Sequence, residues 1–315
     1  MTRVLRSESG GNFAVACADS AGDVAATIVA ISRSFIPLRY HEWLDQQSLV
    51  HNLYTGGRNA RGTDWPMRRI ITLTTDFGTT DGYVGEVKGV LLSNAPDADI
   101  VDITHDIPPQ DVERARLTVA RIWRRFRLGT IHLVIVDPGV GSSRAALVVA
   151  SDGRFLVGPD NGVLSPALLV PGAGVVALSV PTGSSATFHG RDVFAPAAAS
   201  LALGATIDAL GTEARSPIVR RTPEPTRRAD GAIEGEVVVV DRFGNAVTNL
   251  ISLRGGMIEV GSLVIPIRRT YADVKSGEPT AVVGSSGFIE IAIRDSDAAR
   301  ALKLARGTPA ILRNA

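Results

Sequence analysis

The sequence has little cysteine, little excess charge and no long apolar run. Its 315 residues include one cysteine, Cys17, so neither an intrachain disulfide nor a cysteine-based metal cluster can form. The 33 Lys and Arg residues nearly balance the 32 Asp and Glu residues, so no global field attracts nucleic acid or anionic lipid. No run approaches the roughly 18 apolar residues of a membrane span, and the N-terminus lacks the apolar core of a signal peptide. We therefore expect a cytoplasmic protein whose partners include neither nucleic acid nor a membrane.

Several ligand-binding motifs are also absent. The segment TTDFGTTDGYVG lacks the G-x-G-x-x-G spacing of dinucleotide-binding loops, and the P-loop pattern GxxxxGK[ST] occurs nowhere. The five histidines show no HxH or HExxH spacing, which removes the support for a zinc site. We expect no cofactor and no metal, while a Mg²⁺ site made by aspartates stays open as an alternative.

The pattern of apolar residues divides the chain into four segments. Residues 1–66 show no strand–helix alternation, and Met67 then opens a short basic lead into a buried strand. Residues 1–66 are therefore either an extension upstream of the natural start or a genuine, loosely packed appendage. We expect an α/β domain over residues 67–214, a Pro-rich and charged linker over 215–232, and a β domain over 233–315.

Six short runs rich in Ile and Val dominate the α/β segment, and each ends in a Gly, Asp or Pro turn. They are IITLTT, ADIVDIT, TIHLVIVD, AALVVAS, RFLVGPD and GVVALSV. Near-continuous apolarity is typical of strands buried on both faces, which predicts a mainly parallel sheet. Residues 83–96 and 111–126 carry apolar residues at helical spacing, and the arginines of the second segment, including Arg116, are interpreted as a solvated face. Short strands with Gly-rich turns after residue 232 predict a small, mostly antiparallel β domain.

Three aspartates follow apolar runs, where parallel strands are expected to end. They are Asp76, Asp137 and Asp160. Ligands of open α/β sheets bind at this carboxyl edge. A carboxylate there can bind ribose hydroxyls, ligate a metal ion or form a turn, and the residues alone leave all three open.

Two glycine-containing turns add candidates beside these carboxylates. In DPGVGSSR, Gly139 and Gly141 let the backbone approach a ligand closely, and Arg144 follows Asp137 by seven residues. FHGRDVF supplies His189, although a lone histidine is more often a structural residue.

Two motifs of the β domain leave two interpretations open. VDRFGNAVTN either forms an Asp/Gly/Asn hairpin turn or supplies an aromatic face and an amide that bind a purine. For GSSGFIE, a structural and a ligand-binding role are equally open. Their candidate residues are Asp241, Phe243, Asn245, Ser285, Ser286 and Glu290. From the residues alone, we expect a small polar ligand between two domains.

Seven motifs taken together resemble one protein family. TLTTDFGTTDGYVGEVKGV is followed in order by VDITHDIPPQDVERA, VDPGVGSSR, GPDNGVLS, FHGRDVFAP, DRFGNAVTN and GSSGFIEIA. The set is similar to the S-adenosylmethionine hydroxide adenosyltransferase family, which is related to the fluorinating and chlorinating enzymes that attack S-adenosylmethionine (SAM). Residues 1–66 lie outside the resemblance.

The resemblance implies a fold, an assembly and a reaction. The fold is an N-terminal Rossmann-like α/β domain followed by a smaller C-terminal β-barrel-like domain. The assembly is a homotrimer with the ligand between the first domain of one subunit and the second domain of its neighbour. The reaction is hydrolysis of SAM, as its (R)-sulfonium epimer, by water or hydroxide attack at the ribose 5′ carbon, giving adenosine and L-methionine without a cofactor.

The resemblance also implies roles for residues. It assigns catalysis to Asp137, Arg144 and His189, and ribose binding to Asp76. Further substrate contacts would come from Asp81, Tyr83, Asp241, Phe243, Asn245, Ser285, Ser286 and Glu290. A sulfonium leaves as a neutral thioether, so catalysis needs no general acid and can come from holding the nucleophile in line and excluding bulk water. We expect Asp137 and His189 to accept hydrogen bonds from that water.

Three other functions remain as alternatives. A SAM-dependent halogenase is disfavoured because the Asp137 carboxylate would repel a halide and because Gly190 lacks the serine hydroxyl of the fluorinating relatives. A Mg²⁺-dependent phosphohydrolase would use Asp76, Asp137 and Asp160. A non-catalytic adenosine-binding protein would bind the nucleoside without turning over either sulfonium epimer.

Overall fold

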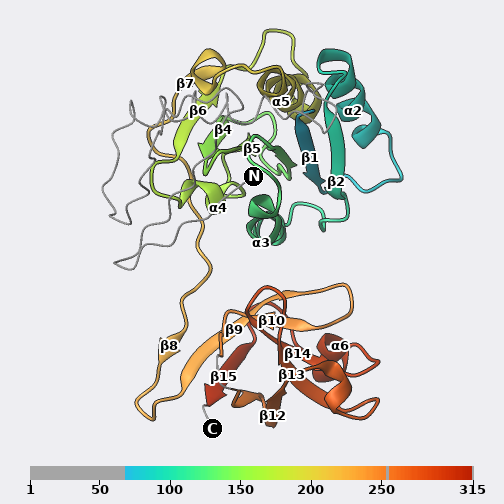
Figure 1. The fold of residues 1–315 in the computed structure, drawn as a ribbon, viewed down its shortest axis with the longest axis vertical. Coiled ribbons are helices and arrows are strands. Elements are labelled where there is room, and N and C mark those ends of the chain that lie inside the picture. Colours follow the sequence, from blue (N-terminus) through green and yellow to red (C-terminus); the bar gives the residue numbers. More distant parts are fainter. Residues whose placement is uncertain (1–67, 253–254, 314–315) are drawn as a thin grey trace, which may run out of the picture. The chain divides into compact units, whose positions relative to one another are not determined.

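The computed structural model describes residues 68–252 and 255–313 (Figure 1). The hypothesis that residues 1–66 precede the natural start at Met67 concerns residues outside this described part. Within the described part, no helix is both long enough and apolar enough to cross a membrane.

The N-terminal α/β part is built on a seven-stranded sheet. Its strands lie in the order β2-β1-β3-β5-β4-β6-β7 (Figure 1). The pairs β1–β2, β1–β3 and β3–β5 are parallel, and the pairs β4–β5, β4–β6 and β6–β7 are antiparallel. The strands are β1 (Ile70–Thr75), β2 (Asp99–Thr104), β3 (Ile131–Ile135), β4 (Ala146–Ser151), β5 (Arg154–Pro159), β6 (Gly174–Leu178) and β7 (Gly211–Glu213).

The prediction of a mainly parallel sheet is therefore correct for one half of the sheet and wrong for the other. The cause is a tight hairpin between β4 and β5, in which Asp152 and Gly153 form the turn. Both residues have positive φ, 48° and 68°, as a two-residue type I′ turn requires. An Asp-Gly pair between two apolar runs is a strong hairpin signal, so the sequence itself carried this information between AALVVAS and RFLVGPD.

Helices cover both faces of the sheet. In Figure 1, α2 and α5 lie on one side of it, and α3 and α4 lie on the other. The apolar stripe of α3 packs on the sheet through Val112, Ala115 and Val119. The helical elements are α2 (Tyr83–Asn94), α3 (Val112–Ile122), the 3₁₀ turn η1 (Trp123–Arg125), α4 (Ser165–Leu168), the π-helical turn η2 (Gly190–Phe194), α5 (Ala195–Ala202) and the 3₁₀ turn η3 (Ile207–Ala209).

One arginine of α3 is not on the solvated face that the sequence predicts. Arg116 is 4% exposed, pairs with Glu113 of the same helix, and donates to Thr222 Oγ1 at 2.8 Å. Thr222 belongs to the segment between the sheet and the barrel, which therefore covers this part of α3. Helical spacing alone does not show that a distant segment will pack over a polar face.

The C-terminal part is a closed seven-stranded β-barrel. The order β9-β10-β14-β13-β12-β11-β15 closes because β15 also pairs with β9, and the short β8 is added to β9. All pairings are antiparallel except β12–β13. The elements are β8 (Thr226–Arg227), β9 (Ile233–Val240), β10 (Ala246–Thr248), β11 (Met257–Val260), β12 (Leu263–Arg268), the 3₁₀ turn η4 (Tyr271–Asp273), β13 (Pro279–Val283), β14 (Ile289–Ile293), α6 (Ala298–Leu302) and β15 (Pro309–Arg313). The predicted combination of an α/β domain with a smaller C-terminal β-barrel is confirmed.

Candidate functional site

Strands β1 and β3 are neighbours, and an aspartate follows each of them at its carboxyl end. Asp76 comes directly after β1, and Asp137 comes two residues after β3. The pKa of Asp76 is raised above its ordinary value, chiefly by burial and to a smaller extent by the negative charge of Asp137. The parallel half of the sheet therefore brings two of the predicted carboxylates to one edge.

Gln110 also belongs to this edge, although the sequence did not single it out. Its backbone N–H donates to Asp76 Oδ2 at 2.8 Å. Gln110 has a φ of 66°, in the left-handed region that few residues other than glycine adopt. The only sequence signal is the Pro-Pro pair before it, which marks a turn but does not show what the turn contacts.

Asp137, Arg144 and His189 form a connected group, called here the Asp137–Arg144–His189 cluster. The guanidinium of Arg144 donates from Nε to Asp137 Oδ1 at 2.9 Å and from Nη2 to Asp137 Oδ2. Nη2 also donates to His189 Nδ1 at 2.9 Å. The side chains of Asp137 and Arg144 are 7% and 9% exposed, and His189 is also buried. A bidentate ion pair that is shielded from solvent holds the carboxylate more rigidly than an exposed pair can.

The contact with Arg144 determines which nitrogen of His189 carries its proton. A guanidinium can only donate, so His189 Nδ1 is the acceptor and the neutral ring has its proton on Nε2. Burial, and then the charge of Arg144, lower the pKa of His189, which favours this neutral form. His189 therefore presents an N–H donor at its remaining nitrogen. This differs from the expectation that His189 accepts a hydrogen bond from water.

A glycine and a π-helical turn bring the two parts of the cluster together. Gly141 has a φ of 77°, and a Cβ at this position would lie 2.4 Å from the carbonyl oxygen of Ala186, so only glycine allows the approach. His189 is the N-cap of η2, and Pro196 follows just inside α5. Proline has no N–H to continue the ordinary helical ladder, and single π turns are frequent at functional sites. The widened turn thus directs His189 toward the loop that follows β3.

The loop after β5 supports the cluster but does not add a carboxylate to it. Asn161 Nδ2 donates to the carbonyl of Val136 at 2.8 Å, directly before Asp137. Asp160 instead accepts from the N–H of Ile218 at 2.7 Å. Among the residues that the structure describes, no three His, Cys, Asp or Glu side chains are grouped so that they could hold a metal ion. Asp160 therefore anchors the following segment, and it does not complete the set that a Mg²⁺-dependent phosphohydrolase would need.

Asp81 and Tyr83 lie at the start of α2. Tyr83 is 48% exposed, and its ring packs edge-on against Phe188 with ring centroids 5.4 Å apart. Phe77 contacts both of these rings. Asp81 is exposed in the turn before α2. The three aromatic rings thus form a cluster next to the polar edge of the sheet, and no local sequence pattern predicts that they meet.

In the barrel, Asp241 holds the turn between β9 and β10. Its Oδ1 accepts from the N–H groups of Phe243 and Asn245 at 2.8 and 2.9 Å, and Asn245 Nδ2 donates to its Oδ2 at 3.0 Å. The aspartate thus forms the Asp/Gly/Asn hairpin turn that was one of the two sequence interpretations. Phe243 is 78% exposed in this turn, so its ring is available to a ligand.

Glu290 and the two serines lie in or beside the β13–β14 hairpin. Tyr271 Oη donates to Glu290 Oε2 at 2.7 Å, and burial together with this contact raises the pKa of Tyr271. Ser286 Oγ is buried and has no hydrogen-bond partner among the described residues. Ser285 is exposed next to it. Tyr271 is a further candidate that the sequence did not identify.

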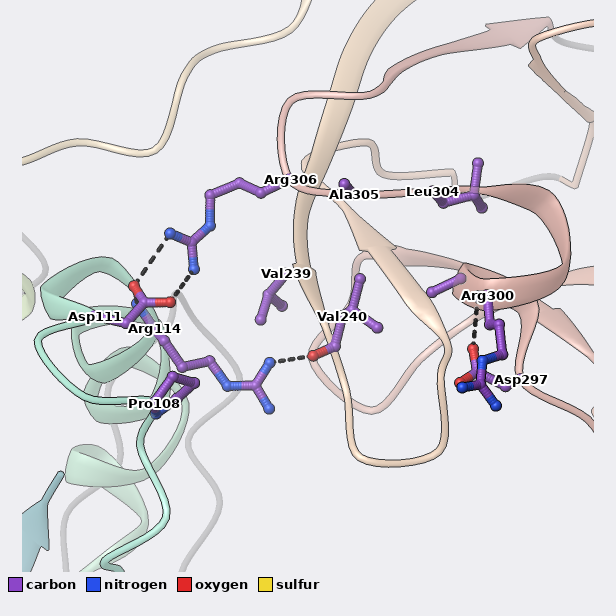
Figure 2. Close-up of a pocket in the computed structure, with 11 residues that line it drawn as sticks. Pro108, Asp111, Arg114, Val239, Val240, Asp297, Arg300, Leu304, Ala305 and Arg306 are labelled. Carbon is purple, nitrogen blue, oxygen red and sulfur yellow. Dashed lines mark hydrogen bonds and ion pairs between the residues drawn. The ribbon is translucent and has the colours of Figure 1, made fainter. Parts of the chain in front are cut away.

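The pocket in Figure 2 does not contain any of the predicted site residues. Arg306 donates to the carboxylate of Asp111 at 2.7 and 3.1 Å, and Arg114 donates to the carbonyl of Val240 (Figure 2). These polar groups bond to one another across the pocket. The lining residues are Pro108, Asp111, Arg114, Val239, Val240, Asp297, Ala299, Arg300, Leu304, Ala305 and Arg306.

Comparisons with known proteins match both parts of the chain. The model for the SAM hydroxide adenosyltransferase N-terminal domain matches residues 71–211, and the model for the C-terminal domain matches residues 235–311. A curated relative, the (R)-S-adenosyl-L-methionine hydrolase of Thermus thermophilus, is 42% identical over 76% of this chain and 98% of its own length. The protein of the same name from Salinispora tropica is 36% identical over 75% of this chain and 95% of its own length. A fluorinase from Actinopolyspora mzabensis is more distant, with 27% identity over 71% of this chain and 90% of its own length.

A solved structure agrees with the fold. The crystal structure of an uncharacterized conserved protein from Thermotoga maritima has a TM-score of 0.71 and 32% identity, over 78% of this chain and 100% of that chain. The two family models together span most of the sheet and the barrel, which confirms the resemblance found in the motifs. The chain belongs to the SAM hydroxide adenosyltransferase family.

Proposed function

We propose that this chain hydrolyses S-adenosyl-L-methionine, with the (R)-sulfonium epimer as substrate, to adenosine and L-methionine. The observation that carries the proposal is the buried Asp137–Arg144–His189 cluster, which lies at the same sheet edge as Asp76. Relatives that are 42% and 36% identical bear the name of this activity.

The cluster suits a displacement at the ribose 5′ carbon. The oxygen of a water forms a bond to C5′ while the C5′–S bond breaks, and the electron pair of that bond stays on sulfur as the neutral thioether of methionine. The water loses one proton. Asp137 accepts a hydrogen bond from the water and then this proton, which passes to solvent, while the Nε2–H of His189 donates to the water oxygen and orients it for attack.

Arg144 positions both of these groups. It donates to Asp137 through two nitrogens and to His189 through one of them, so it restricts the direction in which each can meet the water. Its positive charge also stabilises the hydroxide character that develops on the nucleophile. Burial of the cluster reduces the competition of bulk water for these contacts.

Hydrolysis is better supported than halide transfer. A halide binds to hydrogen-bond donors, and a carboxylate at Asp137 would repel it at the attacking position. Gly190 supplies no hydroxyl, and a Cβ there would lie 3.3 Å from side-chain atoms of Ile135 and Phe188. Identity to the hydrolase of Thermus thermophilus is 42%, against 27% to the fluorinase of Actinopolyspora mzabensis.

We assign substrate binding to two sets of residues. Asp76 binds the ribose hydroxyls at the end of the parallel, Rossmann-like half of the sheet, where nucleotide ligands of such sheets bind. The exposed ring of Phe243 and the unpartnered Oγ of Ser286 support the barrel as the second set. The remaining contacts are assigned to Asp81, Tyr83, Asp241, Asn245, Ser285 and Glu290.

The proposal includes an oligomeric state and a cellular location. The active form is a homotrimer in which the α/β domain of one subunit, residues 67–214, meets the barrel of its neighbour, residues 233–315, with residues 215–232 as the linker. The enzyme acts in the cytoplasm on a small molecule and uses no cofactor.

Incubation of the purified protein with the two separated sulfonium epimers tests the function. We expect adenosine and L-methionine in equal amounts, faster formation from the (R)-epimer, and an unchanged rate in EDTA. Chromatography with added fluoride or chloride should show no halogenated nucleoside. A halogenated product would support the halogenase, phosphate release that EDTA abolishes would support the phosphohydrolase, and tight adenosine binding without turnover would support a binding protein.

The rate should fall at acidic pH as His189 gains a proton. Burial and Arg144 place its pKa below the ordinary 6.5, so the ring is neutral at pH 7 and protonates only as the pH falls below 6.5. A protonated ring has a donor at Nδ1, which opposes the donating guanidinium of Arg144. A profile of kcat/KM against pH should therefore show an acidic limb with its midpoint below 6.5, and a midpoint above 6.5 would contradict the assigned state.

Asp76 also contributes to the acidic limb of this pH profile, because its pKa is raised above the ordinary 3.8. The variant His189→Gln, which has no titrating ring, separates the two groups. It should lose the histidine limb and keep the limb of Asp76.

A further inference from the structure

A buried threonine–histidine pair lies beneath the loop that carries Asp76. Thr75 ends β1 and is fully buried, and its Oγ1 lies 2.9 Å from Nδ1 of His105, which is 7% exposed. The same oxygen accepts from the N–H of Phe77 at 3.3 Å. The Thr75 hydroxyl therefore links His105 to the residue that directly follows Asp76.

The backbone of the segment 105–110 holds the same loop. The carbonyl of His105 accepts from the N–H of Gly78 at 2.8 Å, and the N–H of Ile107 donates to the carbonyl of Thr75 at 3.4 Å. The N–H of Gln110 reaches Asp76 itself. Residues on both sides of Asp76 are thus bonded to the segment that begins with His105.

Asp102 lies beside the other nitrogen of the His105 ring. Its Oδ1 lies 3.1 Å from Nε2 of His105, and its Oδ2 accepts from Lys88 Nζ at 2.6 Å. Burial opposes the charge of Asp102, but the contacts with Lys88 and His105 outweigh it and lower the pKa of this carboxyl. An ionised carboxylate can only accept, so Nε2 is the ring nitrogen whose proton faces Asp102, and Nδ1 is the nitrogen that pairs with the Thr75 hydroxyl.

We propose that His105 and Thr75 are positioning residues that set the direction in which the Asp76 carboxylate meets the two ribose hydroxyls. This inference rests on the proposed function, because it takes ribose as the partner of Asp76. The contacts from the Phe77 N–H through the Thr75 hydroxyl to His105 tie the loop to buried side chains, and this restricts the position of the Asp76 backbone. A carboxylate displaced from that arrangement loses its contact with a diol, while the rest of the nucleoside still binds.

The sheet contains a second buried threonine–histidine pair that serves as a matched control. Thr72 lies in the middle of β1, and His132 lies on the neighbouring β3. Thr72 Oγ1 is 2.8 Å from Nδ1 of His132. Thr72 and Thr75 are 1% and 0% exposed, so replacing either with the isosteric valine removes the same kind of buried hydrogen bond. Only Thr75 bonds to the residue after Asp76.

The test compares the binding of adenosine with that of 2′,3′-dideoxyadenosine by calorimetry on the full chain. The dissociation constant of 2′,3′-dideoxyadenosine divided by that of adenosine measures the contribution of the ribose hydroxyls. In the wild type, Thr72→Val and Thr75→Ser this ratio should be the same, whereas in Thr75→Val it should fall about tenfold, the equivalent of one hydrogen bond. His105→Leu should lower the ratio as well, and His105→Asn, which keeps an acceptor near the position of Nδ1, should restore most of it.

Each outcome of this experiment either supports or overturns the positioning role. An unchanged ratio in Thr75→Val, or an equal fall in Thr72→Val, overturns the positioning role while leaving the proposed function intact. A wild-type protein that binds no adenosine overturns the proposed function and the inference with it, and one that binds both nucleosides equally overturns the assignment of Asp76 to ribose. If Thr75→Val does not fold, the pair His105→Leu and His105→Asn gives the same comparison.

Discussion

Replacement of Asp137 by Asn is expected to lower kcat for adenosine formation by about 10²- to 10⁴-fold, the usual contribution of a group that handles a proton in the transition state. The amide has nearly the same shape as the carboxylate, but it cannot take the proton of the attacking water. Its NH₂ group would also face the N–H donors of Arg144, which now bond to both carboxylate oxygens. Rates at saturating SAM, together with the dissociation constant of adenosine, separate loss of chemistry from loss of binding. We expect adenosine binding to change little.

Asp160 provides the control for this experiment. It also follows a strand at this edge of the sheet, but its carboxylate bonds to the N–H of Ile218 and takes no part in the cluster. Asp160→Asn should keep kcat close to the wild-type value and affect mainly thermal stability. Full turnover by Asp137→Asn would remove the proposed role of Asp137, and an equal loss in both variants would show that the edge needs carboxylates only for its structure.

Mixing two inactive variants is expected to restore activity if each site combines two subunits. Asp137→Asn disables the α/β side of a site, and Phe243→Asp replaces the proposed aromatic contact on the barrel side. Phe243 is 78% exposed, so this substitution should leave the barrel folded. In trimers of randomly mixed subunits, about a quarter of the sites would combine an intact α/β side with an intact barrel side. Co-expressed variants should therefore recover about a quarter of the wild-type rate at low SAM concentration.

The alternative arrangement gives a different result. If each site is formed within one chain, co-expressed variants can show no more than the summed activity of the two separate preparations. Light scattering on each preparation must show a trimer, because a substitution that prevents assembly would also prevent restoration. A monomeric wild-type protein with full activity would contradict the proposed assembly directly.

Local sequence was a good guide to the elements and a poorer guide to their partners. The Ile- and Val-rich runs predicted the strands because burial on both faces requires continuous apolarity. The antiparallel half of the sheet was missed, although its Asp152–Gly153 turn has a clear local cause in two residues with positive φ. The burial of Arg116 had no such local signal, because the segment that covers it lies 106 residues further along the chain.

In the candidate site, too, local sequence predicted the contacts within one loop but not the contacts between distant segments. The step of seven residues from Asp137 to Arg144 is short enough for one loop to pair them, and the motif showed both. The contact of Arg144 with His189 spans 45 residues, and it depends on Gly141 approaching Ala186 and on the π-helical turn at His189. Gln110 and Tyr271 are ordinary residues in their local sequence, and only their contacts with Asp76 and Glu290 place them at the candidate site.

By itself, the sequence determined the family, the α/β and barrel classes, and the residue types that could carry the chemistry, because these follow from apolar periodicity and from short motifs. The tertiary structure alone decided the partner of His189 Nδ1, the separation of Asp160 from the cluster, and the contact of Thr75 with His105 next to the loop that carries Asp76. The physical reason is that hydrogen-bond direction and pKa depend on which groups from distant parts of the chain come within about 3 Å of one another.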